Sequence, residues 1–121
     1  MQKKFFLLLI VFTMVVSLIF PFDNVTKGQT DNGFIISEYI EGSSNNKAIE
    51  LYNGTLTTID LSNYKLALYS NGVLLPSQSV TLSGTLAAGD TYIIAHGSAD
   101  PAILAIADLI SSSVINFNGD D

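Results

Sequence analysis

Three glutamates, Glu38, Glu41 and Glu50, surround the polar run GSSNN at residues 42–46. Carboxylate, hydroxyl and amide oxygens are the ligands that calcium takes in proteins, so their convergence would form an oxygen-rich cation site. The competing interpretation is a turn between two strands, because Gly accepts a positive φ and Ser and Asn side chains hydrogen-bond nearby backbone. We favour the turn and keep the three glutamates as candidate metal ligands.

The segment NFNGDD at 116–121 resembles the middle of an EF-hand calcium loop. Aligning Gly119 with the glycine of that loop places Val114 at its first position, where a carboxylate is required. The EF-hand interpretation therefore fails. An irregular calcium site that uses Asp120 and Asp121 stays open beside the alternative of a polar turn. Apart from calcium, no cofactor is expected.

The residue types that usually carry catalysis are scarce in this chain. It has no Cys, and His96 is the only histidine. Arg is absent, which removes the guanidinium group that recognises phosphate and guanine, so no direct nucleic-acid binding is expected. A Ser-His-Asp set could be assembled around His96, but no G-x-S-x-G motif is present. We expect a histidine on a surface turn at a strand end, no catalytic residues and no enzymatic activity.

The N-terminal residues 1–28 have the organisation of a targeting segment. Lys3 and Lys4 precede the uncharged apolar run FFLLLIVFTMVVSLIF at 5–20. A basic start followed by such a run is typical of a secretory signal peptide. An uncleaved membrane anchor is the alternative, although a span needs about 20 apolar residues. We expect an exported chain, with a domain at 29–121 that contacts a membrane only through an uncleaved N-terminus.

The rest of the chain shows strand patterns separated by turns. Alternation in KAIELYN (47–53) places Ile49 and Leu51 on one face and Glu50 on the other. Asn53-Gly54 predicts a turn, which also explains the glycosylation sequon that begins at Asn53. Further strands are predicted at 34–40, 64–70, 79–84, 91–96 and from 113 onward.

One segment changes period. In SADPAILAIADLI (98–110), apolar residues recur at i, i+3, i+4 and i+7, which predicts a short amphipathic helix. Asp100 is a good N-cap, and Pro101 suits the first helical position. Six short strands with one crossover helix predict an all-β sandwich.

Several of these segments, in this order, resemble the lamin tail domain of bacterial secreted proteins. They are FIISEYIEGSSNNKAIELYN, LSNYKLALYS, LSGTLAAGDTYIIAH, SADPAILAIADL and NFNGDD, which span residues 34–121. The resemblance implies an immunoglobulin-like β-sandwich of the lamin-tail type, in agreement with the strand pattern. It also implies an accessory module for binding or tethering, with no catalytic residues of its own.

Three functions follow as expectations. The first is an exported, non-enzymatic module at the cell surface or outside the cell, whose partner is a protein or a cell-envelope component. The second is the N-terminal fragment of an extracellular nuclease or phosphoesterase that carries this accessory domain. The third is a structural surface-layer component. Downstream coding sequence would separate the second function from the others.

The domain at 29–121 is also expected to be incomplete at its C-terminus. Immunoglobulin-like sandwiches use at least about seven strands over roughly 100 residues, and only six are predicted here. In the proteins that this chain resembles, the NFNGDD segment leads into another apolar strand and a hairpin. Without them, we expect a free strand edge and an exposed apolar surface at Val114, Ile115 and Phe117.

Overall fold

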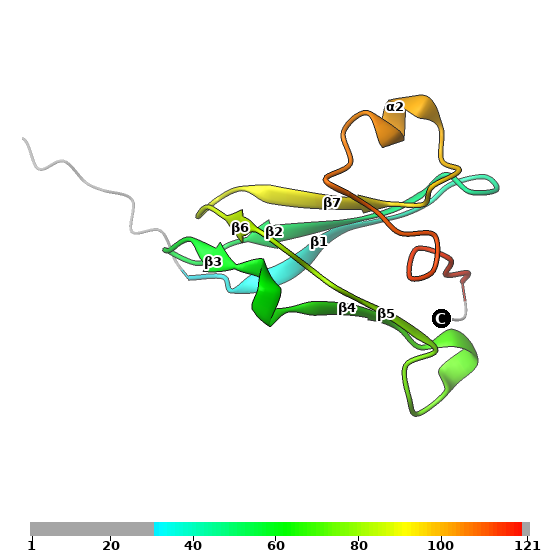
Figure 1. Cartoon of the computed structure of the whole chain (residues 1–121), viewed down its shortest axis with the longest axis horizontal. Coiled ribbons are helices and arrows are strands. Elements are labelled where there is room, and N and C mark those ends of the chain that lie inside the picture. The colour runs from blue at the N-terminus through cyan, green and yellow to red at the C-terminus, as the bar shows by residue number, and fades with distance from the viewer. Residues whose placement is uncertain (1–30, 120–121) are drawn as a thin grey trace, which may run out of the picture.

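Two layers of short β-strands make up residues 31–119, the part of the chain that the structure, a computed structural model, describes. One layer is a four-stranded sheet in the order β1-β2-β7-β8, and the other contains the β4–β5 pair; β3 and β6 form a third, two-stranded pair. Figure 1 shows the β4–β5 pair on one side of the four-stranded sheet and α2 on the other. The predicted all-β sandwich is confirmed. The predicted signal peptide, at 1–28, lies outside the described residues.

The strands and helical turns follow the sequence pattern closely in the first half of the domain and less closely afterwards. Their bounds are β1 (Phe34–Glu41), β2 (Lys47–Asn53), β3 (Ile59–Asp60), η1 (Leu61–Asn63), β4 (Lys65–Leu68), η2 (Ser70–Gly72), β5 (Gln78–Thr81), β6 (Thr85–Leu86), β7 (Thr91–Ala95), α2 (Pro101–Leu104) and β8 (Leu109–Ile110). The two-residue strands β3, β6 and β8 are not visible as alternating patterns, because alternation needs about four residues to show.

The core lies between the two layers. Alternate residues of β2, Ile49 and Leu51, are buried there, as the sequence predicts. β7 runs antiparallel beside β2 and buries Ile94 completely. The opposite layer contributes Leu68 and Leu82 to the same cluster. This agreement follows from the period of two, which sends every second side chain of a strand to one face of its sheet.

The segment from 113 onward differs from its prediction. Residues 112–119 form turns and irregular backbone rather than a strand. Val114, Ile115 and Phe117 are buried in the core, with exposed fractions of 4% or less. The predicted apolar surface at these residues is therefore wrong. Exposed apolar side chains are found instead on β1, where Ile36 is 55% exposed.

The predicted helix at 98–110 is only partly correct. Asp100 caps α2, since its Oδ1 accepts a hydrogen bond from the Ala102 N–H (2.9 Å), and Pro101 begins the helix. The helix ends at Leu104, and from Asp108 onward the chain bonds to β7. Asp108 Oδ2 accepts from the Ile93 N–H (2.8 Å), and β8 then pairs in parallel with β7. Pairing with a distant strand thus replaces the second half of the helix.

Among residues 31–119, no helix is both long and apolar enough to cross a membrane.

Candidate functional site

The loop at 42–46 is held by hydrogen bonds within the loop itself. The Gly42 N–H donates to the Asn46 carbonyl (2.7 Å), and the Asn46 N–H donates to the Ser43 carbonyl (3.1 Å). A Cβ at Gly42 would lie 2.8 Å from the Asn46 carbonyl oxygen, so only glycine fits this close approach. Ser44 adopts a positive φ of 57°. These contacts confirm the predicted structured turn.

The Asn46 side chain connects this loop to α2. Its Oδ1 accepts a hydrogen bond from the Asp100 N–H (2.7 Å), across 54 residues of sequence. The sequence gives no signal for this contact, because both residues are ordinary turn and cap formers on their own. The loop therefore positions the start of the helix that covers the outer face of the four-stranded sheet, the face turned away from β4–β5.

Glu38 and Glu50 lie on this outer face, directly opposite each other on β1 and β2. Glu50 is between the buried Ile49 and Leu51, so its side chain points away from the core. Strict alternation from Ile36, which faces the core opposite Leu51, would turn Glu38 inward. A β-bulge between Ile36 and Glu38 adds one residue and turns Glu38 outward instead.

The extra residue in the bulge is Ser37, and its hydroxyl binds Glu50. Ser37 Oγ donates to Glu50 Oε1 (2.7 Å) and lies 3.3 Å from the Glu50 carbonyl oxygen. This hydrogen bond orients one of the two facing carboxylates. Both glutamates line a small pocket of about 110 Å³, together with the apolar residues Ile40, Ala48, Ile93, Ile103 and Ile106.

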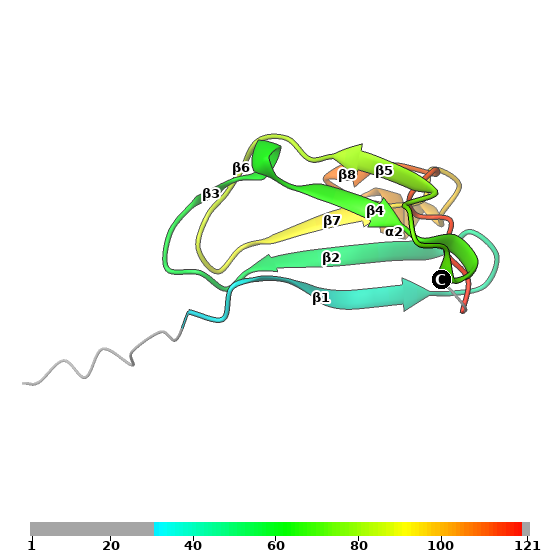
Figure 2. The same ribbon diagram turned by 90° about the horizontal axis from the view of Figure 1, so that it is seen from below.

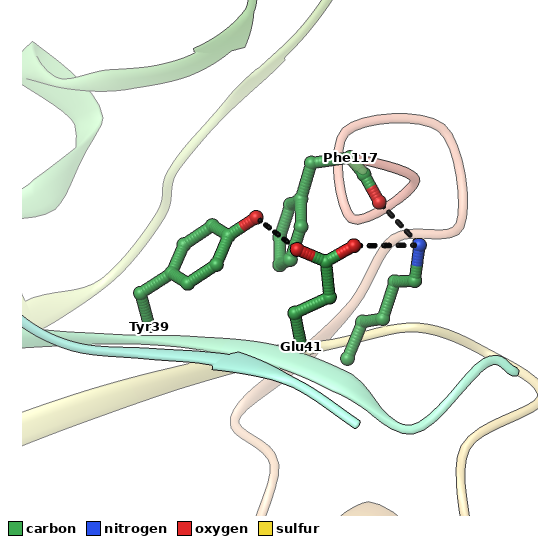
Figure 3. Close-up of polar contacts among 4 residues, drawn as sticks. Tyr39, Glu41 and Phe117 are labelled. Carbon is green, nitrogen blue, oxygen red and sulfur yellow. Dashed lines mark hydrogen bonds and ion pairs between the residues drawn. The ribbon is translucent and has the colours of Figure 1, made fainter. Parts of the chain in front are cut away.

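Glu41, the third glutamate, lies on the other face of the sheet. It is opposite Lys47, and its Oε1 is 3.9 Å from Lys47 Nζ. Figure 3 shows that the Tyr39 hydroxyl also reaches this carboxylate, donating to Oε2 (3.0 Å). The structure thus brings Glu38 and Glu50 together and separates Glu41 from them.

The same cluster holds the last described residues against the sheet. Lys47 Nζ donates a hydrogen bond to the Phe117 carbonyl and lies 5.7 Å from the centre of the Phe117 ring (Figure 3). The Tyr39 and Phe117 rings are 4.3 Å apart, between centroids. Lys47 is already bonded to the Phe117 carbonyl and paired with Glu41. We therefore interpret this cluster as a structural clamp, which holds the segment that contains Phe117 against the sheet.

Within residues 31–119, no three His, Cys, Asp or Glu side chains gather closely enough to hold a metal ion. Glu38, Glu41 and Glu50, the three predicted ligands from the described part of the chain, are divided between two faces of one sheet. The other two candidates, Asp120 and Asp121, lie outside the described residues.

His96 is at the end of β7, as predicted, but it is buried (8% exposed) rather than on the surface. Its Nδ1 accepts a hydrogen bond from the Ser98 N–H (3.0 Å). Its backbone N–H donates to the Lys47 carbonyl (3.0 Å). The imidazole therefore accepts a hydrogen bond that stabilises the turn after β7.

Asn53 is a structural residue that sequence reasoning missed. It is completely buried, and its Nδ2 donates to the carbonyls of Thr57 and Leu86 (2.9 Å each). Its Oδ1 accepts from the N–H (3.0 Å) and hydroxyl (2.6 Å) of Thr55. A fully bonded, buried amide leaves no room for a glycan in the folded domain. The sequon that begins here is therefore a structural motif.

Two apolar grooves lie where β1 faces β4 across the open side of the sandwich. The first, of about 200 Å³, includes Phe34, Ile36 and Leu66 among its lining. The second, of about 230 Å³, includes Ile36, Leu66 and Phe117. Figure 2 shows β1 at the margin of the four-stranded sheet, beyond the area that β4 and β5 cover. The inner face of β1 is thus only partly covered.

Comparison with known proteins gives one family. The family model described as Lamin Tail Domain matches residues 28–121, which is most of the chain. No curated protein and no solved structure matches the sequence.

Proposed function

Since the chain belongs to the lamin tail domain family, we propose that it is an exported, non-enzymatic module that binds or tethers a partner at the cell surface. The family is one of non-catalytic, immunoglobulin-like domains. Export is supported by the sequence, in which Lys3 and Lys4 precede the apolar run at 5–20. Such a chain acts through its surface rather than through a reactive site.

The observation that carries the binding role is the exposure of large apolar side chains on β1. Ile35, Ile36, Tyr39 and Ile40 are 44%, 55%, 51% and 38% exposed. A single exposed Leu or Ile on a monomer is ordinary, but four such side chains on one strand favour an interaction surface. Ile35 and Ile40 lie on the outer face of the sheet, and Ile36 and Tyr39 on the inner face. His96, around which a catalytic set could be assembled on paper, accepts a hydrogen bond within a turn, and Lys47 is bonded to the Phe117 carbonyl.

Export is tested by expressing the full chain, tagged at its C-terminus, in a bacterial host and locating the product. We expect the chain outside the cytosol, with a new N-terminus between about residues 18 and 32. Reversing the charge of Lys3 and Lys4 should reduce export, whereas Lys27→Glu should not. An intact Met1 on a cytosolic protein would contradict export.

Binding is tested separately, by adding the purified chain back to washed cells. We expect saturable retention on the cell envelope, because tethering requires a finite number of sites. Nuclease and phosphatase assays of the same preparation should match a blank. Retention that rises linearly without saturation would contradict a specific binding role, and activity that disappears in His96→Ala would contradict the non-enzymatic one.

A further inference from the structure

A small pocket lies between the outer face of the four-stranded sheet and the segment that contains α2. Its volume is about 110 Å³. Strands β1, β2 and β7 line one side of it, and Ile103 of α2 and Ile106, just after the helix, line the other. Figure 1 shows α2 on this side of the sheet, away from the β4–β5 pair. The pocket is thus separate from the two apolar grooves between β1 and β4.

Hydrogen bonds hold the segment that contains α2 against the sheet at both of its ends. At the start of the helix, the Asp100 N–H donates to Asn46 Oδ1 in the loop before β2 (2.7 Å). After the helix, the Ile93 N–H of β7 donates to Asp108 Oδ2 (2.8 Å), and the Asp108 N–H donates to the Ile93 carbonyl (2.8 Å). The two walls of the pocket are therefore fixed relative to each other, and the pocket is formed before any ligand binds.

The size of the pocket matches one side chain. Sites for cofactors and other small molecules usually measure about 300–1,000 Å³, which is several times larger. A water molecule takes about 30 Å³ in the liquid, so this pocket has room for about four small groups. The four-carbon stem of a lysine fits this room while its ammonium stays near water.

The lining is apolar apart from two carboxylates, those of Glu38 and Glu50. Glu50 Oε1 accepts a hydrogen bond from the Ser37 hydroxyl (2.7 Å). Glu38 is exposed, and in the part of the chain that the structure describes no hydrogen bond or ion pair reaches its carboxylate. Like charges directly opposite each other in a sheet are destabilising, so a cation placed between them is favoured. The apolar lining and the two charges together select an apolar stem that ends in a positive group.

The two cations among residues 31–119 are engaged elsewhere or lie in the other layer. Lys47 is on the opposite face of the sheet, where it contacts Glu41 and the Phe117 carbonyl. Lys65 is on β4. Neither lines the pocket, so its negative charge is left for a cation from outside the described domain.

Building on the proposed binding role, we propose that this pocket binds the side chain of a single lysine from a partner protein. The stem lies between the sheet and the α2 segment, along Ile103 and Ile106. The ammonium lies beside Glu38 and the second carboxylate oxygen of Glu50, with its remaining N–H groups in water. Ser37 is a positioning residue. Its bulge sets Glu38 on the same face as Glu50, and its hydroxyl orients the Glu50 carboxylate.

The test titrates short peptides into the full 121-residue chain and follows the methyl signals of Ile103 and Ile106 by NMR. Each peptide has one variable residue between two pairs of glycines, with both ends blocked. Norleucine keeps the stem of lysine without its ammonium, so the norleucine peptide should bind about two- to fivefold more weakly than the lysine peptide. A glutamate peptide should bind more weakly still. Equal binding of the lysine and norleucine peptides would overturn the proposal.

Two further titrations test where the lysine comes from. Free butylammonium has the same stem and charge without a peptide backbone, and we expect it to bind no more tightly than the lysine peptide. Tighter binding would assign the pocket to a small amine and overturn the proposal. Lys27→Gln should leave the affinity for the lysine peptide unchanged. If it tightens binding, the N-terminal segment of the chain itself competes for the pocket, which would also overturn the proposal.

The chain offers a matched control for the charge. Glu38→Gln should weaken binding of the lysine peptide by about two- to fivefold, the effect of one exposed ion pair, and should leave the norleucine peptide unchanged. Asp90→Asn removes the same charge from the exposed loop before β7 and should change neither peptide. If Asp90→Asn weakens the lysine peptide as much as Glu38→Gln does, only net charge is being measured and the proposed site is wrong.

The apolar wall has a matched control as well. Ile106→Ala removes surface that would cover the stem, so it should weaken the lysine and norleucine peptides alike, by about fourfold, the effect of exposing about one methylene group. Ile110 is a similarly exposed isoleucine outside the pocket (56%, against 62% for Ile106), and Ile110→Ala should leave both peptides unchanged. Equal effects of the two variants would overturn the proposed position of the stem.

Retention of the Glu38→Gln chain on washed cells separates this inference from the proposed function. Full retention together with weakened peptide binding would overturn the lysine pocket as the partner site and leave the binding role standing. Failure of the wild-type chain to be retained would overturn the binding role itself. Weaker retention of Glu38→Gln, with normal retention of Asp90→Asn, is the result we expect.

Discussion

Glu38 and Glu50 face each other directly across the β1–β2 pair, on the side of the sheet that carries α2. Their positions in the sequence do not require this, since Glu38 is two residues from the inward-facing Ile36. The Ser37 bulge creates the pair, and the Ser37 hydroxyl then hydrogen-bonds to Glu50 Oε1. A like-charge pair kept in this way lowers stability, and bulges occur often near functional edges.

Neutralising Glu38 should therefore stabilise the domain. We expect Glu38→Gln to raise the free energy of unfolding by a few tenths of a kcal/mol, because it removes repulsion from Glu50. The same change at Glu41, on the same strand, should lower it by about 0.5–1 kcal/mol, because it breaks the partly buried ion pair with Lys47. Urea unfolding of both variants at low salt measures the two signs.

Salt provides the control for this pair of variants. Screening shortens the range of exposed charges to about 3 Å at 1 M salt, so the gain in Glu38→Gln should shrink there. A gain that is independent of salt would show that the glutamine acts through packing or hydrogen bonding instead of through lost repulsion.

Much of the fold could be predicted because β2, β4 and β5 obey the two-residue period, and β7 is a short apolar run that follows a turn. Ile49 and Leu51 are in the core for this reason, and Leu68 likewise. The helix at 98–110 was predicted too long, because an isoleucine-rich segment suits either period. The end of the segment forms a strand because it pairs with β7, and the Ile93 N–H of β7 donates a hydrogen bond to Asp108. Pairing with a strand that is distant in the sequence cannot be predicted from the local spacing of apolar residues.

The candidate site was predictable only in its parts. The polar run at 42–46 and its flanking glutamates were correctly located, but their division between two faces was not. One inserted residue, Ser37, moves Glu38 to the opposite face of the sheet. The alternation of apolar and polar residues does not predict this bulge. The burial of Asn53 was missed for a related reason. Asn before Gly predicts an exposed turn, whereas its amide here bonds the backbone of two separate segments, one at Thr55 and Thr57 and the other at Leu86.

Asn53 should be among the residues most important for stability. Asn53→Ala removes the partners of the buried Leu86 carbonyl and of the Thr55 N–H, and unpaired buried polar groups cost about 1–3 kcal/mol each. We expect a loss of about 2–4 kcal/mol in the free energy of unfolding. Asn63→Ala is the control, because its side chain is exposed and makes a single long hydrogen bond (3.3 Å). Equal losses in the two variants would contradict the role given to Asn53.

Lys47 should be important for anchoring the segment that contains Phe117. Lys47→Met keeps most of the aliphatic stem but removes the hydrogen bond to the Phe117 carbonyl and the charge beside Glu41. We expect unfolding to become easier by about 1–2 kcal/mol. Amide hydrogen exchange should accelerate most at 114–117. Lys65→Met, at an exposed position of β4, should change neither measurement. Uniform acceleration across the domain would contradict a local clamp.

Acid should destabilise the domain partly through Asp60. This carboxylate caps η1, and Oδ1 accepts hydrogen bonds from the Ser62 hydroxyl (2.7 Å) and the Ser62 N–H (2.9 Å). The Ser62 side chain, and then its backbone N–H, hold the pKa of Asp60 below its ordinary value of 3.8. A carboxylate with a lowered pKa in the folded state contributes stability that is complete above its ordinary pKa. That contribution is lost as the pH falls through the folded-state pKa.

Removing the Ser62 hydroxyl should therefore move this titration. In Ser62→Ala, we expect the pKa of Asp60 to rise towards 3.8, because the stronger of its two hydrogen bonds is gone. Ser62→Thr retains a hydroxyl and should leave the pKa of Asp60 low. The titration is followed by NMR of the Asp60 carboxyl carbon in the full chain, between about pH 5 and about pH 2. Because Asp60→Asn cannot titrate, its free energy of unfolding should fall less than that of the wild type over the same range. An unchanged pKa of Asp60 in Ser62→Ala would show that the hydroxyl bond does not set the charge at this cap.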